Sequence, residues 1–137
     1  MKFYLASKFA LKDNVRRLCA ILEAGGHQVP DVWWNIDGKN HPEQDNRKWH
    51  SLPMVRAIAI RHWNSIAQAD ALILVSHPET PMTFTGANVE VGYAIGKGIP
   101  VFSIGKLERS GMYSPVIQCE TIDELLEAIS IYSLKTR

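Results

Sequence analysis

The sequence has little that would point to secretion, membrane insertion or a disulfide-based fold. It contains two cysteines, Cys19 and Cys119, which are far apart and form no CxxC motif, so neither a disulfide nor a metal site is expected. No apolar run approaches the roughly 18 residues of a membrane span, and the apolar stretch at the N-terminus is too short for a signal peptide. These absences favour a cytoplasmic protein.

An excess of charge of one sign is also missing. The 15 Lys and Arg residues nearly cancel the 14 Asp and Glu residues, and no basic tract occurs, which argues against a nucleic-acid polymer or a membrane surface as partner. The 5 histidines are scattered, so a metal site is not expected. The glycines form neither a GxGxxG motif nor a P-loop, so no NAD or ATP cofactor is expected. A small ligand held by a few local groups remains possible.

Hydrophobic residues make up 46% of the chain and follow alternating strand and helix patterns. Short apolar runs predict strands at 2–6, 28–34, 71–75, 100–104 and 116–118. Helical spacing and capping signals predict helices at 11–24, 53–69, 85–97 and 121–134. The alternation is typical of one α/β domain, residues 1–137, with a doubly wound parallel sheet. For five strands we expect a flavodoxin-like or Rossmann-like three-layer sandwich with strand order 2-1-3-4-5.

A polar segment at 35–51 has no predicted regular structure, and a loop of this length is usually a binding loop or a lid. Tryptophans lie in or near it, and an aromatic face can stack on a nucleobase with about 1–3 kcal/mol per base. Trp34 is the strongest of these candidates, although at least one of the tryptophans should pack against the sheet. Asp31 nearby is a candidate for contacts with the base edge or the sugar hydroxyls.

In a sheet of this order the ligand crevice lies beyond the carboxyl ends of strands 1 and 3. That places 7–9, 76–84 and the start of the helix 85–97 around one cleft. Glu90 is predicted in the first turn of this helix, where free N–H groups and the helix dipole favour an ionised carboxylate. Such a carboxylate can act as a nucleophile at a glycosidic carbon. From position alone, a glutamate that only stabilises its own helix is the commoner explanation.

The residues around Glu90 carry further information. Residues 69–75, Ala-Asp-Ala-Leu-Ile-Leu-Val, precede a loop and the segment 86–101, which includes Glu-Val-Gly-Tyr-Ala-Ile-Gly-Lys-Gly. Together with Phe-Tyr-Leu-Ala-Ser at 3–7, this pattern resembles the nucleoside 2-deoxyribosyltransferase family, which includes the related deoxynucleoside 5′-monophosphate N-glycosidases. The resemblance extends from residue 2 to about 104 and is most specific at the Glu-x-Gly-Tyr-Ala segment.

The resemblance implies a double displacement at an N-glycosidic bond of a nucleoside or its 5′-monophosphate. Glu90 would attack the anomeric carbon to form a glycosyl-enzyme intermediate, and water or a second base would then take the sugar. Tyr4 matches the family's tyrosine that orients this carboxylate. Ser7 and Lys8 match the turn that helps hold a 5′-phosphate in the monophosphate-hydrolysing relatives. Base, sugar and acceptor stay open, and no cofactor is implied.

Further substrate contacts are expected at the start of the helix that carries Glu90. Thr85 can offer a hydroxyl, and Gly86 belongs to the matching segment. Asn88 stands where the family often has glycine, and its amide can cap the helix or contact the sugar. The resemblance also implies assembly, and we expect at least a homodimer that buries the helix 53–69.

One departure from the family pattern concerns the acid that protonates the leaving base. The family places a carboxylate on the helix before Ala69-Asp70, whereas this sequence has His62 at that position. A histidine can donate a proton near neutral pH, so His62 is a candidate acid. The role can instead be lost or pass to Asp31 or Asp37. The alternative function is a nucleotide-binding module on the same fold that senses without cleaving.

Overall fold

A parallel sheet of four strands forms the centre of the computed structural model, which describes residues 1–36 and 53–136. The strands follow one another in the order β1-β2-β3-β4. Their bounds are Phe3–Ala6 (β1), Ala71–Val75 (β2), Val101–Ile104 (β3) and Ile117–Cys119 (β4). Every residue of the first three strands is buried, in keeping with their mainly apolar sequences.

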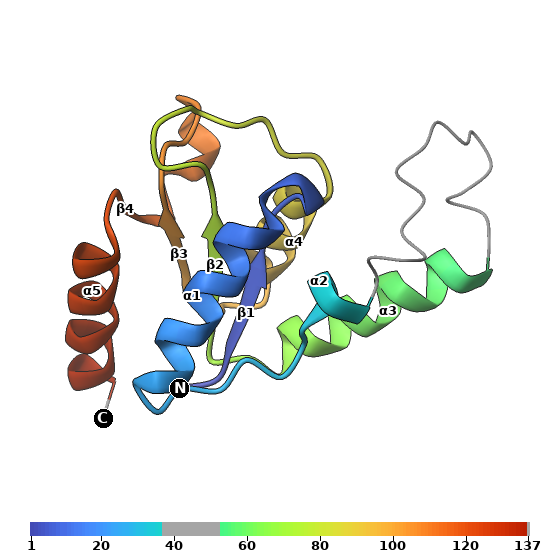
Figure 1. Ribbon diagram of the computed structural model, residues 1–137, viewed down its shortest axis with the longest axis horizontal. Helices are drawn as coiled ribbons and strands as arrows, with labels where there is room; N and C mark the ends of the chain where they lie inside the picture. The colour runs from blue at the N-terminus through green and yellow to red at the C-terminus, as the bar shows by residue number, and fades with distance from the viewer. Residues whose placement is uncertain (37–52, 137) are drawn as a thin grey trace.

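Helices cover both faces of this sheet, with α1 in front of it and α4 behind it in the view of Figure 1. α4 packs against the first three strands, α3 against β1 and α4, and α5 against β3 and β4. The bounds are Lys12–Ala24 (α1), Trp33–Ile36 (α2), Pro53–Ala67 (α3), Gly86–Gly96 (α4) and Ile122–Lys135 (α5). Short 3-10 turns occupy Phe9–Leu11 (η1) and Gly111–Tyr113 (η3). None of the described helices is long and apolar enough to cross a membrane.

The predicted strand at 28–34 does not form, and the prediction of five strands in the order 2-1-3-4-5 is replaced by the four described above. Among the described residues, the segment makes a single isolated parallel bridge, between Gln28 and Lys2 just before the start of β1. Pro30 lacks an N–H for a sheet ladder, and the chain then turns into α2. The indole of Trp33 anchors that turn, because its Nε1 donates to the carbonyl of Leu5 at 2.7 Å.

Candidate active site

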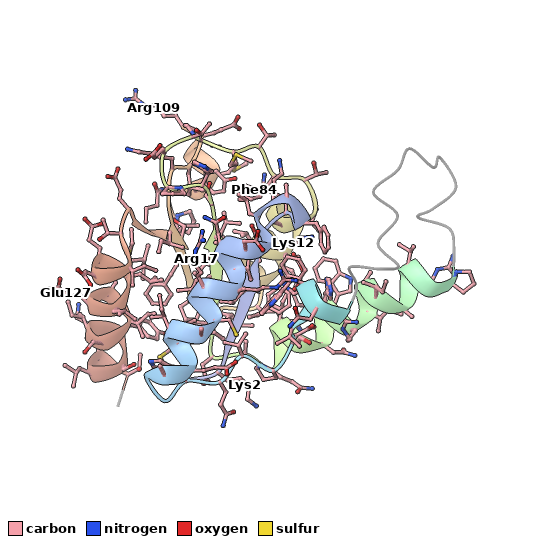
Figure 2. The ribbon with its side chains drawn as sticks, in the orientation of Figure 1. Lys2, Lys12, Arg17, Phe84, Arg109 and Glu127 are labelled. Carbon is pink, nitrogen blue, oxygen red and sulfur yellow. The ribbon has the colours of Figure 1, made fainter. Side chains whose placement is uncertain are left out.

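A cavity of about 530 Å³ opens at the carboxyl end of β1, between α3 and the beginning of α4. Its lining is mainly apolar and includes aromatic side chains from several elements: Phe9, Trp33, Trp63 and Phe84. Figure 2 labels Phe84 at this end of the molecule, well away from Glu127 on α5. The polar groups of the lining are few, as is usual in pockets that bind small molecules.

Glu90 reaches the cavity from the second turn of α4. The sequence had predicted it in the first turn. Its side chain is 13% exposed. The hydroxyl of Tyr4 donates a hydrogen bond to Glu90 Oε2, and His62 Nδ1 lies 3.4 Å from the same oxygen. The carboxylate is therefore held by neighbouring side chains, and the free N–H groups of the helix start are one turn away.

Tyr4 lies in the middle of β1, almost entirely buried below the cavity. Burial raises the pKa of its phenol well above the ordinary value, and the negative charge of Glu90 and the hydrogen bond to it add to the rise. The phenol thus stays protonated over the whole neutral range and remains a donor to the carboxylate.

His62 projects from α3 toward the same carboxylate. Its ring packs at an angle against Tyr4, with centroids 5.9 Å apart, and against Trp33 at 6.4 Å. The structure thus brings together the three predicted catalytic residues from β1, α3 and α4. We refer to Tyr4, His62 and Glu90 as the Glu90 cluster.

Asp31, which the sequence predicted as a substrate contact, is not among the residues that line the cavity. Its carboxylate is buried and accepts from Arg61, through Nη2 at 3.3 Å and Nε at 3.4 Å. The hydroxyl of Ser65 donates to it at 2.7 Å. We refer to Asp31, Arg61 and Ser65 as the Asp31 cluster, in which the carboxylate is buried and both of its oxygens accept hydrogen bonds.

Four of the predicted substrate-binding residues line the cavity, namely Ser7, Lys8, Thr85 and Gly86. The hydroxyl of Ser7 is already engaged, because it donates to the carbonyl of Val75 at 2.7 Å. Lys8 Nζ lies 5.9 Å from the centre of the Phe84 ring, a cation–π distance. Lys8 therefore provides a positive charge in the mainly apolar lining of the cavity.

Trp34 and Asn88 do not line the cavity. Trp34 is buried in the core with its ring edge-on to Trp33, at a centroid distance of 5.5 Å. Asn88 joins two loops, because its amide donates to the Phe84 carbonyl at 2.8 Å and its Oδ1 accepts from the Tyr113 hydroxyl at 2.6 Å. Asp37 and Trp49 lie outside the described residues.

The α3 residues that line one side of the cavity, other than His62, were not predicted, although the sequence contains a pattern that marks them. Four residues of α3 follow the spacing i, i+3, i+4, i+7 and all line it: Val55, Ile58, Ala59 and His62. This spacing normally marks the face that a helix buries against a core. Here that face lines a cavity, so the stripe that leads to His62 marks the site. Among the described residues, no group of three His, Cys, Asp or Glu side chains is placed to hold a metal ion.

The geometry can be compared with known proteins. The family model described as nucleoside 2-deoxyribosyltransferase matches residues 3–118. The chain belongs to this family. A search of curated proteins found no match. Among solved structures, that of the Clostridium botulinum CMP N-glycosidase BcmB shares the fold, with a TM-score of 0.57 and 16% sequence identity. The match covers 95% of this chain and 99% of that one. Family membership supports an enzyme of the deoxyribosyltransferase or N-glycosidase kind.

Proposed function

We propose that this protein cleaves or exchanges the N-glycosidic bond of a (deoxy)nucleoside or its 5′-monophosphate, with Glu90 as the nucleophile. The observation that carries the proposal is a carboxylate at the wall of an apolar cavity, held by the hydroxyl of Tyr4 and contacted by His62. Aligned donors of this kind hold a nucleophile in one orientation without neutralising it.

The proposed reaction has two displacements. A carboxylate oxygen of Glu90 bonds to the anomeric carbon while the carbon–nitrogen bond breaks and its electron pair leaves with the base. Within the described residues, the contacts of Glu90 are all made by Oε2, so Oε1 is the proposed attacking atom. Water or a second base then bonds to the same carbon, and the ester bond to Glu90 breaks to regenerate the carboxylate.

The lining of the cavity suggests how a nucleotide would be held. Trp33 replaces Trp34 as the aromatic candidate for stacking on the base, because it faces the cavity. Lys8 and the first N–H groups of α4 at Gly86 would receive a 5′-phosphate. We therefore expect 5′-monophosphates to react better than the corresponding nucleosides.

Assembly into at least a homodimer through α3 is part of the proposal. Ile60 on α3 is 53% exposed, and Val89 on the adjacent helix α4 is 57% exposed. Exposed large apolar side chains on two helices that pack together favour contact with a second copy. Light scattering at micromolar concentration should give at least twice the mass of 15.4 kDa. A monomer would contradict this.

The direct test is incubation with a panel of nucleosides and 5′-monophosphates, with and without a second free base, followed by chromatography for released or exchanged base. We expect base release that Glu90→Gln abolishes. Lys8→Met should lower kcat/KM for monophosphates and leave nucleosides unchanged, since the positive charge is lost. Tight binding of nucleotides without release of any base would favour a sensing module instead, an alternative motivated by the histidine at position 62.

A further inference from the structure

The two ring nitrogens of His62 contact groups of opposite character. Nδ1 lies 3.4 Å from Glu90 Oε2, and Nε2 lies 3.1 Å from Arg61 Nη2. A guanidinium has only N–H donors, so in this contact the Nε2 of His62 must be the acceptor. A carboxylate only accepts, so the hydrogen toward Glu90 belongs to Nδ1. The two partners therefore select one tautomer of the ring.

Arg61 is itself held in place by hydrogen bonds to Asp31. Its Nη2 and Nε donate to the buried carboxylate of Asp31, which also accepts from Ser65. The side chain of Asp31 is 4% exposed, so this anion needs the cation of Arg61 as its partner. A guanidinium keeps its charge at all accessible pH values. The Asp31 cluster thus presents a permanent N–H donor to His62 Nε2.

We propose that Arg61 holds His62 as the neutral tautomer protonated on Nδ1, so that His62 positions the nucleophile Glu90 and does not protonate the departing base. The inference rests on Glu90 being the nucleophile of the proposed function. A second proton on His62 would place an Nε2–H against the N–H of Arg61, with both groups positive. The base nitrogen, which receives the electron pair of the broken bond, then takes its proton from water.

Within residues 1–36 and 53–136, the charged and titratable groups facing His62 come from three elements. Arg61 lies on the same helix, Glu90 on α4 and Tyr4 on β1, and Asp31 is behind Arg61. If His62 worked as an imidazolium acid, the enzyme would lose activity as the pH rises through about 6.5, the ordinary pKa of histidine. A neutral Nδ1–H donor is unchanged above that pH. We therefore expect kcat/KM to stay level from about pH 7 to 9.

The primary test is nuclear magnetic resonance of the intact protein labelled with ¹⁵N in its histidines, with His62 assigned from the spectrum of His62→Asn. The expected result at pH 7 is a protonated Nδ1 and an unprotonated Nε2. A proton on Nε2, in either the other neutral tautomer or the imidazolium, would overturn the proposal. This measurement does not require an active enzyme. The tautomer of His62 and the release of base are therefore independent results, and either prediction can be wrong while the other is right.

A matched pair of variants tests the role in catalysis. The amide N–H of His62→Asn can replace Nδ1–H toward Glu90, whereas the longer side chain of His62→Gln presents its amide where Nε2 was. We expect His62→Asn to keep kcat within roughly 10-fold, and His62→Gln to lose roughly 10- to 150-fold, the range for a hydrogen bond to a charged group. Equal, near-complete loss in both variants would indicate an acid and overturn the proposal.

The part played by Arg61 is tested by the double variant Asp31→Asn/Arg61→Met, which removes the two charges of the Asp31–Arg61 pair together, so that neither is left without the other. We expect a folded protein by circular dichroism in which His62 shifts toward the Nε2–H tautomer and kcat falls with little change in KM. An unchanged His62 tautomer in the folded double variant would show that Arg61 does not select it.

Discussion

Two carboxylates at this end of the molecule, Asp31 and Glu90, differ in the partners that surround them. Asp31 is bound by the cation of Arg61 and by Ser65. Within the described residues, Glu90 has no Lys or Arg partner and is contacted by Tyr4 and His62. The charge of a carboxylate paired with a cation is compensated by that cation. A carboxylate held by neutral donors has no such compensation, so its charge remains available for a reaction. Environment, and not residue type, separates a structural from a catalytic carboxylate.

The sharpest contrast is expected from removing each carboxylate's charge. Glu90→Gln keeps an acceptor for the Tyr4 hydroxyl but removes the nucleophile, so base release should fall by at least about 10³-fold, while the free energy of unfolding changes by less than about 1 kcal/mol. Rates come from chromatography and stability from urea unfolding. Glu127→Gln, on exposed α5, is the control and should retain full activity. An active Glu90→Gln enzyme would remove the contrast.

Asp31→Ala should behave in the opposite way and lower stability most. It leaves Arg61 and Ser65 without their shared acceptor, and breaking a buried pair costs about 3–5 kcal/mol. The Arg61 side chain is 34% exposed, so we expect about 2–3 kcal/mol after solvent screening. Asp13→Ala, which breaks an exposed pair with Arg16, should cost less than about 1 kcal/mol. Equal losses in urea unfolding would contradict the assignment of Asp31 as a buried support.

Tyr4→Phe tests the donor that Glu90 has and Asp31 lacks. Loss of a hydrogen bond to a charged group should reduce kcat by roughly 10- to 150-fold with a smaller change in KM. Tyr132→Phe is the matched control, because Tyr132 lies on α5 and packs edge-on against Phe102 of β3, away from the cavity. A Tyr4→Phe enzyme with unchanged kcat would show that the hydroxyl does not position the nucleophile.

The raised pKa of Tyr4 also predicts a dependence of stability on alkaline pH. The folded protein holds this proton to higher pH than the unfolded chain, whose tyrosines titrate near 10. The stability contributed by Tyr4 is thus complete below about pH 10 and is lost as the pH rises toward the folded value. Denaturation measured between pH 9 and 11 should show a steeper loss of stability for the native protein than for Tyr4→Phe. Parallel curves would contradict this.

The smallest effect is expected from Asn88→Ala. It removes the hydrogen bonds to the Phe84 carbonyl and the Tyr113 hydroxyl, which should cost about 1 kcal/mol of stability. Because Asn88 does not line the cavity, KM should stay within about 2-fold of the native value. A large rise in KM without loss of stability would instead indicate that Asn88 contacts the substrate.

Much of the fold was predictable because several strands are buried on both faces. Residues 71–75 are a continuous apolar run, residues 101–104 are apolar except for Ser103, and both are fully buried strands in the structure. The segment 28–34 also holds several apolar residues, but Pro30 interrupts it, and its end enters α2, where the indole of Trp33 bonds to the β1 backbone. Composition alone does not reveal that a side chain will bond to a strand's backbone.

The site was predictable where a motif fixed the residue and not where tertiary partners did. Glu90 and Tyr4 were predicted from the segments that carry the family pattern, and His62 from the position at which the family has a carboxylate. The structure brings the three side chains together. Asp31 and Asn88 are polar residues near the expected cleft, yet Arg61 and Tyr113 occupy their polar groups. Such pairings join residues about 25 to 30 positions apart, which local sequence does not specify.

The central claim is that Glu90 forms the bond to the sugar, and mass spectrometry of the reacting enzyme tests it most directly. The protein is incubated with a reactive nucleotide, quenched with acid and digested, and the peptide containing Glu90 is examined. With Glu90 as the nucleophile, we expect a mass increase on Glu90 equal to that of the sugar or sugar phosphate, and no increase in the Glu90→Gln variant. Release of base with the sugar attached to another residue, or with no attached sugar under conditions that slow the second displacement, would contradict it.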